Sequence, residues 1–212
     1  MNAQTALSYV EKSGIVCGMR GAFPPEKATH VARILLKHDI TCFELTMNSK
    51  QPIEAMQAIK AEFGDQVCVG MGTVLNVDDA HRVLDAGADF IVSPAFQPHV
   101  VEVILARDVL VAPGVITPSE AITAWDMGVK LLKIFPIGSL GLDYFKAIRG
   151  PLNHLRFMCN GGMDADNAHE FIKAGAVAAL DDEELHRPVA GAHALGQLVK
   201  MLGAARSDAV WK

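Results

Sequence analysis

Residues 124–136 read AWDMGVKLLKIFP, which is the end of a helix, a glycine and an apolar strand in succession. The same order recurs in LDAGADFIVSP, residues 84–94, and in IKAGAVAALDD, residues 172–182. The glycine of each unit stands where a helix would end in the left-handed conformation that glycine adopts readily. Helix–glycine–strand units that recur at intervals of about 40 residues are typical of an α/β barrel.

Apolar segments of strand length alternate with amphipathic segments along the whole chain. Because the strand candidates have no polar face, we expect a parallel sheet covered by helices. Helices should start at Asn76, at Pro118-Ser119-Glu120 and at Asp164, and residues 186–212 read as a last barrel helix. The expected strands are residues 14–20, 41–46, 67–73, 89–94, 109–114, 130–136, 155–160 and 176–180.

The sequence therefore predicts one domain over residues 1–212, of the α/β class: a (β/α)8 TIM barrel with an extra N-terminal helix over residues 1–13. An open doubly wound sheet is the alternative. It is less favoured because no GxGxxG motif follows the first strand.

The bulk composition bears on partners and compartment. Of the 212 residues, 50% are hydrophobic and 20% are charged, and the net charge of −5 argues against nucleic acid or an anionic membrane as a partner. No apolar run is long enough to span a membrane, and the polar N-terminus does not resemble a signal peptide. The 4 cysteines lie in apolar runs without a CxxC pair, which favours small core residues in a reducing cytoplasm.

Lys133 is the anomaly in the opening stretch, because its counterparts in the other two units are the apolar Val92 and Leu180. One interpretation is that its stem lies along the barrel while the amine reaches the mouth. The other is that burial lowers the pKa of the amine from about 10.4, so that it attacks a ketone and forms a Schiff base. The iminium then draws electrons from a neighbouring carbon–carbon bond, which breaks an aldol bond without a metal.

Glu44, in CFELTMNS, is a second charge among apolar neighbours. It could form a buried ion pair with Lys133, or it could shuttle protons for the amine. Strand ends of a parallel barrel converge on one face, where Arg20 could grip a carboxylate and Thr73 lies beside glycines that admit a ligand. Gly161-Gly162 could present N–H groups to an anion at a helix N-terminus.

Six segments in this order and spacing resemble the class I aldolases that act on 2-keto-3-deoxy-6-phosphogluconate, 2-keto-3-deoxy-6-phosphogalactonate and 4-hydroxy-2-oxoglutarate. The segments are FELTMNS (43–49), VGMGTVLN (69–76), AGADFIVSP (86–94), APGVITPSEA (112–121), LLKIFP (131–136) and CNGGMDADN (159–167).

The resemblance implies a TIM barrel that needs no metal or other cofactor and commonly assembles as a homotrimer. It implies Lys133 as the Schiff-base lysine and Glu44 as the acid/base. Arg20, Thr73 and the region of Pro94 would hold the pyruvate-like part of the substrate, with Phe135 beside the lysine. The expected enzyme is a lyase that reversibly cleaves a 2-keto-3-deoxy sugar acid or a 4-hydroxy-2-oxo acid to pyruvate and an aldehyde.

Two positions depart from the family pattern. Asn160 replaces the usual threonine or valine before the double glycine, which would alter a hydroxyl contact. Asp181 and Asp182 stand where phosphate-binding members have a turn with glycine and serine. Each carboxylate at about 4 Å from a phosphate charge costs roughly 4 kcal/mol at an effective dielectric near 20. Either Asp182 contacts a substrate that lacks the terminal phosphate, or these acids cap the next turn and face solvent.

Two other functions stay open. A metal-dependent lyase would use Glu44 with Asp181 and Asp182 as oxygen ligands of magnesium. A non-catalytic ligand-binding barrel would retain the fold without turnover.

Overall fold

The computed structural model describes residues 1–164 and 166–181. The strands within them are β1 (Ile15–Met19), β2 (Cys42–Thr46), β3 (Cys68–Gly72), β4 (Phe90–Val92), β5 (Leu110–Ala112), β6 (Gly114–Val115), β7 (Leu132–Ile134), β8 (Phe157–Asn160) and β9 (Ala178–Asp181). The helices are α1 (Ala3–Ser13), α2 (Pro25–Leu36), α3 (Pro52–Phe63), α4 (Val77–Asp85), α5 (Pro98–Leu105), α6 (Pro118–Asp126), α7 (Ile137–Arg149) and α8 (Ala168–Lys173), with the short 3-10 helix η1 (Gly64–Gln66) after α3.

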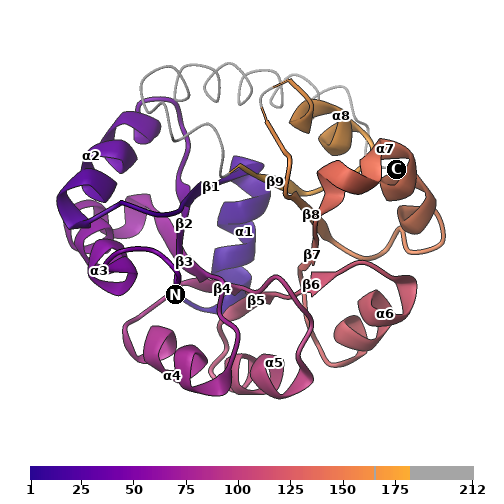
Figure 1. The fold of residues 1–212 in the computed structure, drawn as a ribbon, viewed down its shortest axis with the longest axis horizontal. Helices are drawn as coiled ribbons and strands as arrows, with labels where there is room; N and C mark the ends of the chain where they lie inside the picture. The colour runs from indigo at the N-terminus through magenta and orange to yellow at the C-terminus, as the bar shows by residue number, and fades with distance from the viewer. Residues whose placement is uncertain (165, 182–212) are drawn as a thin grey trace.

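The described strands form one parallel sheet in the order β5-β4-β3-β2-β1-β9-β8-β7-β6. Its two edge strands are separated in sequence by Pro113 alone, which has no N–H to donate to a ladder. The fifth expected strand is therefore one strand interrupted by a proline, and the sheet closes at that point. Helices surround the ring of strands (Figure 1). The predicted (β/α)8 barrel is confirmed; the expected last barrel helix lies outside the described residues.

Local sequence chemistry explains most of the element boundaries. Asn76 accepts a hydrogen bond from the Asp79 N–H at the start of α4, and Thr117 forms a capping box with Glu120 at the start of α6. The glycines that end α4, α6 and α8 have φ of 89°, 101° and 102°, respectively, as the repeat predicted. The expectation that a helix starts at Asp164 is wrong: α8 begins at Ala168.

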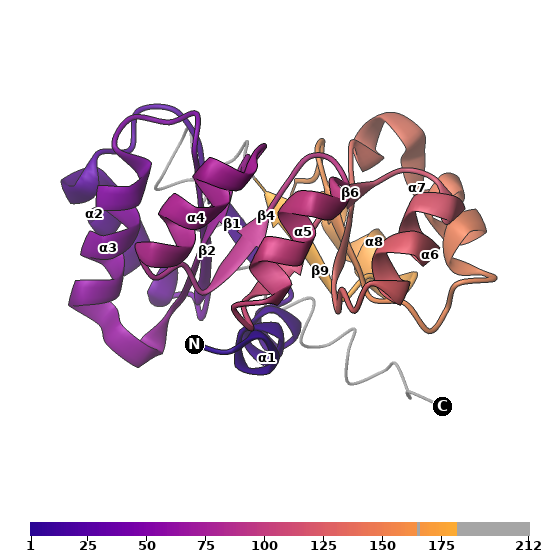
Figure 2. The same cartoon turned by 90° about the horizontal axis from the view of Figure 1, so that it is seen from below.

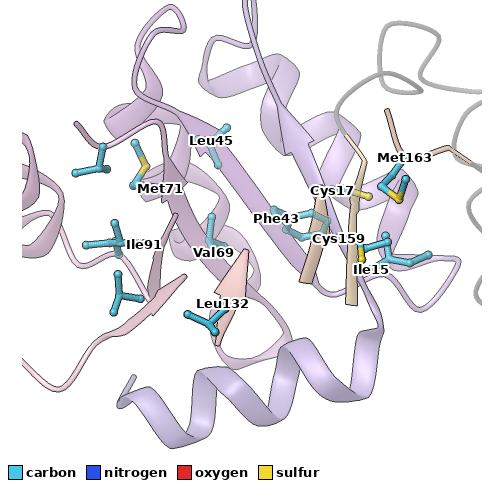
Figure 3. Packing of buried hydrophobic residues seen from close by; sticks show 14 of the residues in the cluster. Ile15, Cys17, Phe43, Leu45, Val69, Met71, Ile91, Leu132, Cys159 and Met163 are labelled. Atoms are coloured by element: carbon cyan, nitrogen blue, oxygen red, sulfur yellow. The ribbon is translucent and has the colours of Figure 1, made fainter. Parts of the chain in front are cut away.

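Two apolar layers make the core. Outward-facing strand residues such as Phe43, Leu45 and Val69 pack toward the surrounding helices (Figure 3). Inward-facing residues such as Cys42 and Leu131 belong to a second cluster, which the N-terminal helix joins through its own buried side chains. Figure 2 shows this helix, α1, lying beneath the barrel. Because α1 lies across the N-terminal end of the barrel, we expect a ligand to enter at the C-terminal end of the strands.

None of the helices in the described residues has the length and apolar character needed to span a membrane.

Candidate active site

Lys133 projects into the barrel. Its strand neighbours Leu132 and Ile134 belong to the outer apolar layer, whereas Leu131 belongs to the inner one, and alternation along a strand places Lys133 on the side of Leu131. The residue is 5% exposed. Its Nζ lies 4.6 Å from the centre of the Phe135 ring, within the range of a cation–π contact.

Glu44 also projects into the barrel, since Phe43 and Leu45 on either side of it belong to the outer layer. It is 2% exposed and pairs in register with Gly18 on β1 and Gly70 on β3. Its carboxyl group lies directly over the Cα of Gly72: a Cβ added there would lie 1.6 Å from Glu44 Oε1. The glycine at position 72 therefore leaves the space that this carboxyl group occupies.

Arg20 is the exposed residue that follows β1. The loop that it begins is tied to the loop after β2, because the Gly21 N–H donates to Ser49 Oγ at 2.8 Å and the Lys50 N–H donates to the Gly21 carbonyl at 3.0 Å. Ser49 Oγ is in turn 2.7 Å from Thr46 Oγ1 at the end of β2. The structure thus joins the segment that carries Arg20 to the strand that carries Glu44.

Thr73 has φ of 60°, a left-handed conformation that is unfavourable for a β-branched residue. It follows β3, is partly buried, and lines a pocket of about 580 Å³ together with Met47, Asn48 and Leu75. Backbone strain of this kind is often found at functional sites, where the surrounding structure holds it in place.

The Pro94 carbonyl closely approaches Gly114, whose added Cβ would lie 2.2 Å from that oxygen. Gly114 pairs in register with Lys133. The chain after β4 therefore reaches the strand pair that carries the lysine, and a side chain at position 114 would prevent this approach.

The end of β8 carries Asn160, which is 2% exposed and donates through Nδ2 to the Leu180 carbonyl at 3.2 Å. Gly161 and Gly162 follow with φ of 83° and 75°. A Cβ on Gly161 would lie 2.9 Å from the Phe135 ring, so that ring lies between this turn and Lys133. The expectation that the double glycine stands at a helix N-terminus is wrong, because α8 starts only at Ala168.

Asp182, predicted as a substrate contact, lies outside the described residues. Asp181 is the last residue of β9, in register with Cys17. Within residues 1–164 and 166–181, no three His, Cys, Asp or Glu side chains are grouped so that they could hold a metal ion.

Buried thiols are poor competitors of the amine as nucleophiles. Burial raises the pKa of the Cys159 thiol. The pKa of Cys68 is raised first by a hydrogen bond with Cys42 and then by burial. Both thiols therefore stay protonated near neutral pH, and a thiolate is the reactive form of cysteine.

Sequence reasoning interpreted the glycines beside Thr73 as room for a ligand, and it missed that three glycines make room for other parts of the protein. A side chain at position 72 would collide with Glu44, and one at position 114 would collide with the Pro94 carbonyl. Gly138, at the start of α7, packs against the backbone of the double-glycine turn. The alternation of glycines in VGMGTV was the one available signal, since glycine in a strand often marks a close approach.

Comparisons with known proteins identify the family of the chain. The family model for KDPG and KHG aldolase matches residues 16–187. A 2-dehydro-3-deoxy-phosphogluconate aldolase from Treponema pallidum is 36% identical over 155 residues, which are 73% of this chain and 73% of that protein.

Two solved structures share the fold. A structure described as native KDPGal is 27% identical with a TM-score of 0.81, over 93% of this chain and 96% of that one. A cube-shaped cage designed by fusing symmetric oligomeric domains is 26% identical with a TM-score of 0.80, over 92% of this chain and 72% of that one. The chain belongs to the KDPG and KHG aldolase family.

Proposed function

We propose that the protein is a pyruvate-dependent class I aldolase, a lyase that reversibly cleaves a 2-keto-3-deoxy sugar acid or a 4-hydroxy-2-oxo acid. The observation that carries the proposal is the 5% exposed amine of Lys133 inside a barrel that also encloses the 2% exposed carboxyl group of Glu44. Burying charged groups in a barrel is costly. Catalysis through an uncharged amine and a proton-transferring carboxyl group accounts for both.

The chemistry follows from these two groups. Lys133 Nζ adds to the C2 ketone, and loss of water from the carbinolamine gives an iminium ion. Glu44 takes the proton of the C4 hydroxyl group while the C3–C4 bond breaks. The bonding electrons pass to the iminium nitrogen, the aldehyde leaves, and the resulting enamine takes a proton at C3. Water then releases pyruvate and restores the amine.

The remaining site residues have proposed binding roles. Arg20 holds the carboxylate of the keto acid, and Thr73 and the backbone at Pro94 surround the same half of the substrate. Phe135 is proposed to shield the iminium, which is supported by its 4.6 Å contact with Nζ. Asn160, Gly161 and Gly162 face the half that leaves as the aldehyde.

We further propose a substrate that lacks a terminal phosphate, with Asp182 as a contact to its hydroxyl groups. The support is the sequence LDDEEL at residues 180–185, in which four acidic residues follow Leu180 directly. Pyruvate release from phosphorylated and unphosphorylated keto-deoxy acids, compared side by side, tests this. A preference for the phosphorylated acids refutes it.

We propose that the domain, residues 1–212, acts in the cytoplasm as a homotrimer. The 4 free buried thiols in the described residues support a reducing compartment. The related designed cage, which was built from symmetric oligomeric domains, supports assembly of some kind. Light scattering of the purified protein measures the mass directly; a monomer refutes the trimer.

Pyruvate release in the presence of a chelator separates the aldolase from its alternatives. The proposal predicts unchanged turnover with EDTA and loss of turnover in Lys133→Met. A metal-dependent lyase, which would rely on Glu44 and Asp181 with Asp182, predicts loss with EDTA. A non-catalytic barrel predicts no turnover of any keto-deoxy acid by the unmodified chain.

A further inference from the structure

Both carbonyl groups of the double-glycine turn are held by hydrogen bonds from outside it. The Gly138 N–H donates to the Gly161 carbonyl at 2.7 Å, and Asn167 Nδ2 donates to the Gly162 carbonyl at 2.9 Å. The first donor stands in the second residue of α7, five residues after Lys133, and the second immediately precedes α8. The turn is therefore fixed from two elements at once.

These two bonds set the direction of the N–H groups that follow. In a trans peptide the carbonyl and the next N–H point in opposite directions. With the Gly161 and Gly162 carbonyls directed at Gly138 and Asn167, the N–H groups of Gly162 and Met163 point away from those donors. Within the described part of the chain, these two N–H groups donate to no acceptor. The turn thus presents two donors whose natural partner is an electron-rich oxygen.

Position 138 has no room for a side chain. A Cβ there would lie 2.7 Å from the Gly161 oxygen and 2.9 Å from the Gly162 Cα, which are backbone atoms that cannot rotate away. In return, a Cβ on Gly162 would lie 3.1 Å from the Gly138 Cα. The start of α7 and the turn are therefore in direct backbone contact.

We propose that Asn167 and Gly138 are positioning residues for the aldolase reaction, because they turn the N–H groups of Gly162 and Met163 toward an oxygen on the half of the substrate that leaves as the aldehyde. The inference rests on the proposed function. It assigns neither residue a contact with the substrate.

Asn167→Asp separates this role from a structural one. Asn167 Oδ1 also accepts from the Asp164 N–H at 3.1 Å, and an aspartate keeps that acceptor while it loses the donor to the Gly162 carbonyl. Loss of one or two substrate hydrogen bonds predicts that KM for the keto-deoxy acid rises about 5- to 30-fold. The pyruvate concentration for half-maximal borohydride trapping, which reports only the pyruvate half, should change by less than about twofold.

Three further variants complete the experiment. Asn167→Ala removes the donor without adding charge, and Gly138→Ala disturbs the other carbonyl; both should raise KM and leave pyruvate trapping unchanged. Asp166→Ala, on the exposed neighbouring residue, is the matched control and should leave both values unchanged. Melting temperatures confirm that each variant is folded.

The proposal is overturned if KM stays within twofold in Asn167→Asp and Asn167→Ala. It is also overturned if only the aspartate raises KM, since the added charge then explains the effect, or if KM and pyruvate trapping worsen together. The proposed function fails separately, through absence of trapping in the unmodified protein.

Discussion

Gly72→Ala tests whether the space above position 72 sets the place of the Glu44 carboxyl group. The added Cβ would lie 1.6 Å from Glu44 Oε1 and 2.4 Å from its Cδ. A non-bonded separation of about 3.5 Å is required, so the carboxyl group must move by about 2 Å.

The magnitude follows from that displacement. A misplacement of about 1 Å can lower a rate about 100-fold, and an acid/base residue contributes about 10²- to 10⁴-fold. We expect kcat to fall at least about 100-fold, which is about 2.7 kcal/mol of transition-state free energy. The clash involves the end of a flexible side chain, so unfolding should become easier by only about 1–3 kcal/mol.

The assay is a double-mutant cycle with Glu44→Gln, read by the rate of pyruvate release and by thermal unfolding. If the alanine acts by displacing the carboxyl group, adding it to Glu44→Gln should cost less than about threefold more, because the two changes remove one contribution. Effects that multiply, or a Gly72→Ala enzyme within threefold of the unmodified kcat, would refute the reasoning.

Three more predictions concern stability and strain. Asp89→Ala, at the N-terminal end of the barrel, removes the carboxylate that accepts from the Val69 N–H at 2.9 Å and from Lys60 Nζ at 2.6 Å. We expect the free energy of unfolding, measured by thermal unfolding, to fall by about 2–3 kcal/mol with unchanged kcat. A lower kcat in the fully folded variant would contradict this. Thr73→Gly should relieve about 1–2 kcal/mol of left-handed strain while it raises KM; a destabilised variant with normal KM would count against a functional role. Burial raises the pKa of Glu120, but hydrogen bonds from the Ile116 N–H and from Thr117 outweigh it and hold that pKa below 4.5. Because the folded pKa is depressed, the carboxylate stabilises the fold above pH 4.5 and this contribution is lost as the pH falls through the folded pKa; the melting difference between Glu120→Gln and the unmodified protein should therefore shrink below pH 4.5, and a constant difference would refute it.

The barrel was readable from the sequence because its signals are local and repeated. Glycines after α4, α6 and α8 and apolar runs without a polar face are properties of short segments, and each of the eight expected strand segments overlaps an observed strand. Pro113 splits the fifth of them, a consequence of its missing N–H. Asp164 was misjudged as a helix start because its carboxylate bonds the N–H groups of Asp166 and Asn167 in a turn that precedes the helix.

Only some residues of the candidate site could be predicted from the sequence. Lys133 and Glu44 stood out because a charged residue within an apolar run can be recognised from the sequence alone. Gly72 and Gly138 act through contacts with segments far away in the chain, and Asn167 acts through a bond to a carbonyl five residues before it. Among the three, only Gly72 had a local signal, the alternation of glycines in its strand. Their significance depends on the barrel that brings the segments together.

The central claim is that the buried amine of Lys133 bonds covalently to a keto acid. Incubation with pyruvate and borohydride, followed by peptide mass spectrometry, tests it most directly. The account predicts a stable reduced pyruvate adduct on Lys133, abolished in Lys133→Met, that does not need a metal. An unmodified Lys133 in a folded protein at saturating pyruvate, or an adduct confined to other lysines, would contradict it.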